Sequence, residues 1–289
     1  MVYISIVSPG YFDRLVSVAE QVPSVLSTAA PMLKTVDNVH TVFHLGPRLS
    51  QSGFATVFLL PGQPDQVFRI QECTQIREIV DEVRLGQKLE AAGLAPSTIA
   101  HYLDRTHHGM LMQRYQMDLQ HWFKTSTPTI HRRSLWPMRV RQLLRSMART
   151  GVFCIDLKPA NIVINVEDMG IIREMKLIDF GGGLCWESSQ LLPDTPHLPW
   201  QVVYATLLLV FNASIKHSEP EIYARHGDNG PFAETILTVL RGPETRLTVA
   251  QILDQPLLRH YWSNLFFRVP IDTYTTYFMH LPEPDDGRT

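Results

Sequence analysis

Four polar side chains of the kinds used in phosphoryl transfer stand close together in the middle of the chain. Residues 154–161 read Cys-Ile-Asp-Leu-Lys-Pro-Ala-Asn, and residues 177–181 read Leu-Ile-Asp-Phe-Gly. When a phosphoryl group passes from a nucleotide to a hydroxyl, one Asp orients the hydroxyl and a Lys neutralises the moving charge, while an Asn and a second Asp hold Mg²⁺. Their residue types make Asp156, Lys158, Asn161 and Asp179 the candidates for these four roles.

Two short apolar runs between the motifs predict a hairpin that holds them in place. The runs are residues 162–164 and 175–177. A purely structural interpretation is also open, because Lys-Pro-Ala-Asn suits a turn between a helix and a strand, and an Asp before Gly181 suits a strand end. The occurrence of both motifs at this separation favours the chemical interpretation.

Strand patterns precede the motifs, and helical patterns dominate after them. Residues 54–60 and 66–70 predict two strands joined by a Pro-Gly turn, and residues 99–103 and 110–114 predict two more. Helical spacing of apolar residues, with stop signals, is found over residues 11–26, 76–92, 139–150, 198–212 and 248–257. The first of these helices is expected to pack on the following domain, with a partner-binding or regulatory arm as the alternative.

The motifs resemble the catalytic loop and the Asp-Phe-Gly element of eukaryotic-type protein kinases, and the Lys-Pro pair resembles their serine/threonine branch. The resemblance implies an α+β, bilobal protein-kinase-like fold over residues 41–265, with a β-rich N-lobe to about residue 115 and a mainly helical C-lobe. It implies ATP and Mg²⁺ as cofactors and a protein as substrate. A helical arm (residues 1–40) and a C-terminal segment and tail (residues 266–289) lie outside this domain.

The resemblance extends to both sides of the motifs. Glu82 falls where the family has the glutamate that pairs with a lysine of the third strand, and Glu78, one turn earlier, is the alternative. Residues 111–115 resemble the fifth strand and hinge, which implies Met112 as the gatekeeper and backbone groups from Gln113 to Tyr115 that face adenine. Residues 246–253 resemble a helix start late in the C-lobe.

Two departures affect the expected nucleotide site. Arg69 stands where the family has its phosphate-gripping lysine, and a forked guanidinium is not equivalent to an ammonium. Residues 50–57 align with the family's glycine-rich loop, in which Val57 matches, Gly53 is one position off, and the three glycines are replaced by Ser50, Ser52 and Ala55. Glycine allows close backbone approach there, so we expect a stiffer loop whose serines still donate hydrogen bonds to phosphate.

Other departures concern regulation. Cys154-Ile155 replaces the His-Arg that precedes the catalytic Asp, so the usual receptor for an activation-loop phosphate is missing. The segment after Asp179 is short, and the helix around Trp200 lacks the family's bracing aspartate. Activation by loop phosphorylation is therefore not expected. Compact kinases of viruses and bacterial effectors are trimmed in similar ways, which makes such an origin a hypothesis.

Composition limits the remaining possibilities. The 289 residues are 45% hydrophobic and 19% charged, which is typical of a globular protein, and the formal net charge of −2 gives no general attraction to nucleic acid or to membranes. Three widely spaced cysteines fit a reducing compartment, so we expect a cytoplasmic protein, or one in host cytoplasm or a virion if the origin is viral. The arginines at 141, 145 and 149 are expected to form a solvated helix face, with a docking face as the alternative.

Two functions follow from the sequence. The first is an atypical serine/threonine kinase that uses Mg-ATP and needs no loop phosphorylation, because all four polar residues of the motifs remain. The second is a pseudokinase scaffold that acts through protein contacts, because Arg69 and the lost glycines weaken nucleotide binding. A small-molecule kinase is a third option, which the Lys-Pro loop disfavours.

Overall fold

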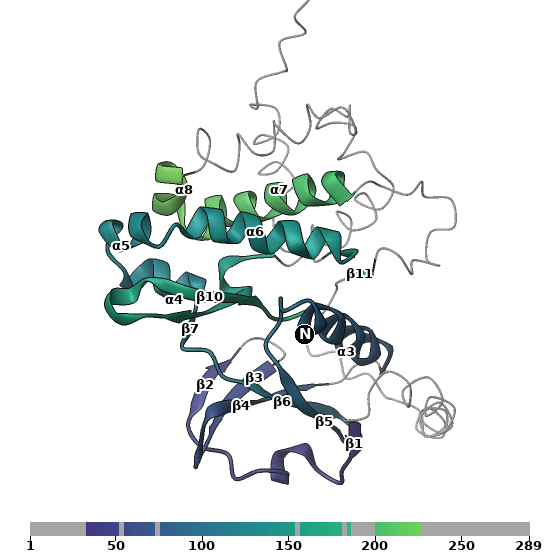
Figure 1. The fold of residues 1–289 in the computed structure, drawn as a ribbon. Helices are drawn as coiled ribbons and strands as arrows, with labels where there is room; N and C mark the ends of the chain where they lie inside the picture. Colours follow the sequence, from purple (N-terminus) through teal and green to yellow (C-terminus); the bar gives the residue numbers. More distant parts are fainter. Residues whose placement is uncertain are drawn as a thin grey trace, which may run out of the picture. The chain divides into compact units, whose positions relative to one another are not determined.

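The computed structural model describes residues 33–51, 55–72, 76–153, 157–180, 184–185 and 200–226 (Figure 1). The chain divides into two compact units. Unit 1 is Met1–Arg84 with Thr98–Met112, and unit 2 is Leu85–Ser97 with Gln113–Thr289. The dividing point between them falls inside helix α3 (Ile76–Ala91). The expected helices over residues 11–26 and 248–257 lie outside the described residues.

Unit 1 is built on a six-stranded sheet with the order β1-β5-β6-β4-β3-β2 (Figure 1). The short β1 runs parallel to β5, and the β2–β3, β3–β4 and β5–β6 pairs are antiparallel. A 3-10 turn, η1 (Val39–Thr41), follows β1. The strands are β1 (Leu33–Thr35), β2 (Arg48–Gln51), β3 (Ala55–Leu60), β4 (Gln63–Glu72), β5 (Thr98–Leu103) and β6 (His107–Gln113).

Alternation along β4 separates an apolar face from a polar one. Phe68 and Ile70 are buried in a cluster with Tyr102 and neighbouring aliphatic side chains, and the Phe68 and Tyr102 rings meet edge to face. Successive residues of a strand point to opposite sides, so Arg69 and Gln71 share the other face. The strand therefore packs one set of side chains into the core and presents polar groups on the opposite side.

The described part of unit 2 combines helices with three small strand pairings (Figure 1). Its hairpin is β9 (Ile162–Val166) with β10 (Ile172–Leu177), which has β7 (Met117–Asp118) on the β9 side, and β8 (Val152–Phe153) pairs with β11 (Leu184–Cys185). The helices and 3-10 turns are α4 (Leu119–Thr125), α5 (Pro128–Arg133), α6 (Trp136–Arg149), η2 (Pro159–Asn161), η3 (Asp168–Gly170), α7 (Trp200–Ser218) and α8 (Pro220–His226). The hairpin register pairs Ile162 with Leu177, as the two apolar runs suggested.

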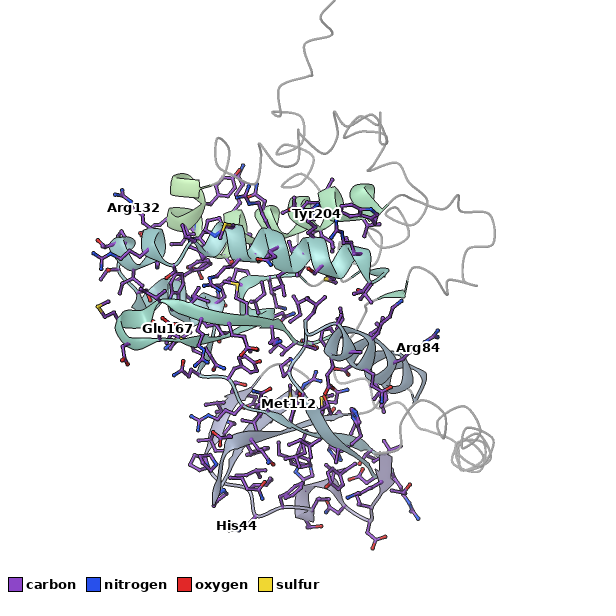
Figure 2. All side chains as sticks on the ribbon, viewed as in Figure 1. His44, Arg84, Met112, Arg132, Glu167 and Tyr204 are labelled. Carbon is purple, nitrogen blue, oxygen red and sulfur yellow. The ribbon has the colours of Figure 1, made fainter. Side chains whose placement is uncertain are left out.

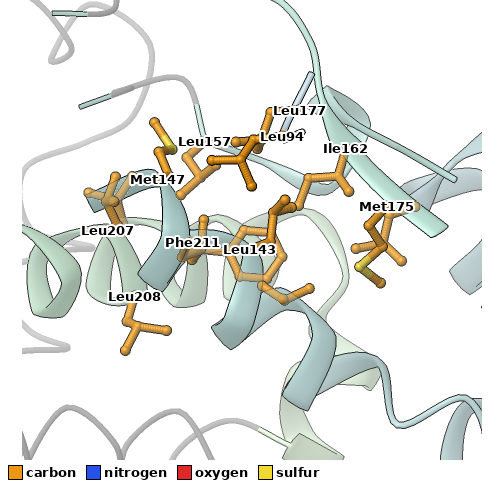
Figure 3. Packing of buried hydrophobic residues seen from close by; sticks show 14 of the residues in the cluster. Leu94, Leu143, Met147, Leu157, Ile162, Met175, Leu177, Leu207, Leu208 and Phe211 are labelled. Carbon is orange, nitrogen blue, oxygen red and sulfur yellow. The ribbon is translucent and has the colours of Figure 1, made fainter. Parts of the chain in front are cut away.

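The core of unit 2 lies between helix α6, helix α7 and the hairpin. Leu143 and Met147 of α6, Leu207 and Phe211 of α7, and Ile162 of β9 are buried together (Figure 3). Burial of each such apolar side chain is worth about 1.5–3 kcal/mol. No helix within the described part of the chain is long and apolar enough to cross a membrane. The expected α+β class is confirmed, with the strands of unit 1 leading into the helices of unit 2.

Candidate active site

Arg69 and Glu82 form a buried ion pair within unit 1. Arg69 Nη1 lies 2.5 Å from Glu82 Oε1, and Gln71 Nε2 donates a hydrogen bond of 2.8 Å to Glu82 Oε2. The two donors are two residues apart on β4 and leave the strand on the same side. Both therefore reach one carboxylate of helix α3. The side chain of the alternative partner, Glu78, lies outside the described residues.

The Glu82 carboxylate of this ion pair is a buried negative charge. Glu82 is only 4% exposed, and an ionised carboxylate there is costly unless it is paired and hydrogen-bonded. Burial by itself raises the Glu82 pKa, but the charge of Arg69 and the hydrogen bonds from Arg69 and Gln71 outweigh burial and hold the pKa below its ordinary value. The carboxylate is therefore ionised at neutral pH.

Three expected nucleotide-site residues form a row across the sheet of unit 1. The strand register places Ser50 of β2 opposite Val57 of β3, and Val57 opposite Arg69 of β4. Residues directly opposite each other on neighbouring strands project from the same face. The row therefore presents a hydroxyl, an aliphatic group and a guanidinium side by side. Ser52 and Gly53 lie outside the described residues.

Asn161 and Asp179 lie at the same end of the hairpin in unit 2. Asn161 immediately precedes β9, and Asp179 follows β10 by one residue, so antiparallel pairing brings both to one edge. The Ile178 N–H donates a 3.0 Å hydrogen bond to the Asn161 carbonyl oxygen and ties the two segments together. Asn161 is only 7% exposed. Two oxygen-bearing side chains are thus held on adjacent backbone segments.

The backbone at Asp179 has an uncommon conformation. Its φ is +61°, in the left-handed region that residues with a Cβ seldom adopt, although Asp tolerates it better than most. Such conformations persist where the surroundings enforce them, and they cluster at active sites. The next residue, Phe180, supplies an anchor, because its ring is buried with Leu85 and Leu89 of helix α3 and faces Gly86.

The loop that carries Lys158 is anchored to the core of unit 2 by an apolar side chain. Leu157 is buried in the core of unit 2 (Figure 3), and Lys158 beside it is partly exposed. Pro159 begins the 3-10 turn η2, which closes with a 2.9 Å hydrogen bond from the Asn161 N–H to the Lys158 carbonyl. The first residue of the motif, Asp156, lies outside the described residues.

The expected hinge runs from the end of β6 in unit 1 into unit 2. Met112 is paired with Thr98, and the Gln113 N–H donates to the Ser97 carbonyl. Tyr115 is turned into the protein, where burial and then the Glu174 carboxylate raise the pKa of its phenol. Its side chain is therefore a packing element, and only its backbone groups are suited to the expected contact with adenine.

The described donors suit Mg²⁺ bound together with a nucleotide. Mg²⁺ prefers oxygen ligands and is commonly held by one or two side chains, with phosphate oxygens and water completing the shell. Asn161 and Asp179 offer an amide and a carboxylate oxygen of this kind. No group of three or more His, Cys, Asp or Glu side chains that would hold an ion by themselves is found among the described residues. This donor set is compatible with a nucleotide-supplied shell rather than a closed protein cage.

Some polar residues of unit 1 were missed in the sequence. Gln71 was not predicted to contact Glu82, although its spacing of two from Arg69 on a strand was a usable signal. The strand expected over residues 110–114 begins earlier, because His107 and His108 both belong to β6, and His108 is buried. His108 contacts His101 of β5.

The arginine stripe of α6 serves an unexpected structural purpose. The guanidinium groups of Arg145 and Arg149 lie over the ring of Trp200, at 5.7 and 4.7 Å from its centroid, and so join α6 to the start of α7. The same part of α7 carries Tyr204, which is buried (Figure 2). The stripe is therefore not a purely solvated face, because two of its members cover an aromatic side chain.

Comparison with solved structures gives the fold. The chain is similar to the crystal structure of the BubR1 kinase domain, with a TM-score of 0.53 and 11% sequence identity over 96% of this chain and 100% of that chain. No family model matches the chain, and no curated protein matches it. At this identity the similarity defines the fold alone. The protein has a kinase-like fold.

Proposed function

We propose that this chain is an atypical serine/threonine protein kinase of the cytoplasm. It transfers the γ-phosphate of ATP, bound with Mg²⁺, to protein hydroxyls without prior phosphorylation of its own loop. Asp156 orients the hydroxyl and takes its proton, and Lys158 offsets the charge of the moving phosphoryl group. Asn161 and Asp179 hold the metal, and Arg69 binds phosphate in place of the usual lysine.

The observation that carries this proposal is the buried Arg69–Glu82 ion pair. In a kinase-like fold, the charge at this strand position must be joined to the helix glutamate for transfer to proceed. Here the contact is made by arginine at 2.5 Å, with Gln71 on the second carboxylate oxygen. The replacement thus keeps the positive charge and its partner. The enforced backbone of Asp179 adds support on the side of unit 2.

A pseudokinase scaffold is the second candidate, and the same residue favours it. Arg69 is engaged with Glu82, and its planar fork delivers charge to phosphate in a different geometry from an ammonium group. Ser50 and Ala55 also carry side chains where the family has glycines. In this case the chain acts through protein contacts, with nucleotide binding weak or absent.

Transfer of radiolabelled phosphate from ATP to mixed protein substrates separates the two candidates. Wild type should give signal, and Asp156→Asn should lower it about 10²- to 10⁴-fold, as expected for loss of a catalytic acid–base group. Asp168→Asn is the matched control, because Asp168 is an exposed carboxylate at the far turn of the same hairpin. No signal from wild type, together with no Mg-ATP thermal shift, would establish the scaffold.

Arg69→Lys tests whether the guanidinium is a working replacement. Lysine offers one point charge and loses the forked contact, so the Glu82 pair should weaken and transfer should not rise. The rate is measured beside wild type in the same assay. A large gain in the lysine variant would mean that arginine damps the activity.

A further inference from the structure

Two buried histidines stack on each other in the sheet of unit 1, and we call them the histidine pair. His101 and His108 are 2% and 1% exposed, their ring centroids are 5.3 Å apart, and their planes differ by 14°. The β5–β6 register sets them diagonally on one face, with His108 opposite Leu103. Leu103 packs against Ile79 and Val83 of helix α3, so the pair lies on the side of the sheet that α3 covers.

The contact between the rings limits how many protons they hold. His101 Nδ1 lies 3.1 Å from His108 Nε2, so one nitrogen donates and the other accepts. Two cationic rings would place N–H against N–H and break the contact. His108 Nδ1 is buried and has no hydrogen-bond partner among the described residues. No described group therefore stabilises an extra proton through a hydrogen bond at that atom.

The charged groups that act on the histidine pair belong to the ion pair of the candidate active site. Glu82 on α3 favours protonation of both rings, and Arg69 on β4 opposes it at His108. Burial is the largest influence on each ring, and the net result lowers the pKa of His101 to about 4 and that of His108 to about 3. At neutral pH both rings are uncharged, and Glu82 is engaged by Arg69 and Gln71.

We propose that the histidine pair is a positioning element for Glu82, which stays committed to Arg69 and Gln71 only while both rings are uncharged. The effect on phosphate transfer rests on the proposed kinase function, whereas the effect on the Glu82 contacts does not. A proton added to either ring creates a second buried cation that competes with Arg69 for the carboxylate. Loss of the Arg69–Glu82 contact then turns off transfer.

The coupling between the histidine pair and Glu82 can be measured without any enzymatic activity. Proton binding to the rings is followed by nuclear magnetic resonance of the histidine Cε1–H groups in the full chain. Glu82→Gln should lower the proton affinity of the pair about fivefold or more, as expected for a direct coupling between two sites. An unchanged midpoint, or rings that titrate near pH 6.5 in wild type, would overturn the proposal.

A measurement on the wild-type protein also tests the proposal if the Glu82→Gln variant does not fold. The side-chain carboxyl carbon of Glu82 should change its signal at the pH at which the rings gain their first proton. A Glu82 signal that follows only the titration of Glu82 itself would overturn the proposal. His107→Gln is the matched control, since His107 is the adjacent histidine of β6, contacts Asp104 and is not buried with the pair.

The consequence for function is read from the pH profile of phosphate transfer. His101→Gln removes the ring that takes up the first proton, at a pKa of about 4, and keeps a hydrogen-bonding side chain, so its rate should decline less than that of wild type between pH 7 and pH 4. His107→Gln should follow wild type. If no variant transfers phosphate, the proposed function fails, whereas the resonance experiments still decide the positioning role. Identical profiles for wild type and His101→Gln would refute that role.

Discussion

Removing one half of the Arg69–Glu82 ion pair should destabilise the protein more than removing both halves. Arg69→Met leaves a carboxylate that is 4% exposed with Gln71 as its remaining described partner. Breaking a buried pair in this way costs about 3–5 kcal/mol. The Arg69 side chain is 15% exposed, which gives water some access, so we expect about 3 kcal/mol for Arg69→Met.

The double variant, Arg69→Met with Glu82→Leu, supplies the second arm of the comparison. With both charges gone, the desolvation cost disappears, and replacement of a buried pair by apolar groups is often close to neutral. Its loss should therefore be smaller than that of Arg69→Met alone. Asp65→Asn is the control on the same strand, because Asp65 is exposed and a surface change of this kind stays within about 0.5 kcal/mol.

The assay is urea unfolding of the full chain, with hydrogen exchange of the β4 amides as a local readout. Midpoints of the wild type, the single variants and the double variant form a cycle that isolates the pairwise contribution. A coupling of at least about 1.5 kcal/mol is expected. Additive single losses, each below about 1 kcal/mol, would refute the reasoning, because they would mean that the pair is solvated in solution.

Three further outcomes follow from packing and protonation. Lowering the pH from 7 to 5 should destabilise the protein. The two histidines bind protons below pH 6.5 in the unfolded state, whereas in the folded state their pKa values are about 4 and about 3. The contribution of the two rings to the free energy of unfolding is fully present above pH 6.5. Below that pH it falls by up to about 1.4 kcal/mol per pH unit for each ring, which urea titration measures. Gly86→Ala places a Cβ 3.5 Å from the Phe180 ring, an ordinary contact, so helix propensity should raise stability by about 0.5–1 kcal/mol in thermal unfolding. Gly109→Ala places a Cβ 2.5 Å from the Phe68 ring and should lower stability by about 1–3 kcal/mol in the same experiment.

The sequence predicted those elements whose signals are local. β-rich runs joined by a Pro-Gly turn marked β3 and β4, and the helix predicted over residues 76–92 agrees with helix α3, which ends at Ala91. The hairpin of unit 2 followed from two apolar runs, and its register joins Ile162 to Leu177. These features depend on neighbours in the chain, so one sequence contains the information.

The polar contacts that depend on tertiary packing were harder to predict. Strand β6 begins earlier than the sequence predicted. The side-chain carboxylate of Asp104 accepts hydrogen bonds from the N–H groups of Thr106 and His107 and so closes the preceding turn earlier. That closure moves His108 into the strand and against His101. Helix periodicity alone likewise could not show that Arg149 would cover Trp200 from another helix. Such pairings join residues that are distant in sequence, and only the folded chain brings them together.

The most direct test of the account is calorimetric titration of ATP into the full chain, with and without Mg²⁺. The account predicts binding that strengthens with Mg²⁺ in wild type, because Asn161 and Asp179 supply oxygen ligands at one edge of the hairpin. Asp179→Asn should lose that metal dependence, whereas Asp168→Asn, at the opposite end of the hairpin, should keep it. Equal ATP affinity in the presence and absence of Mg²⁺ for all three proteins would contradict the account.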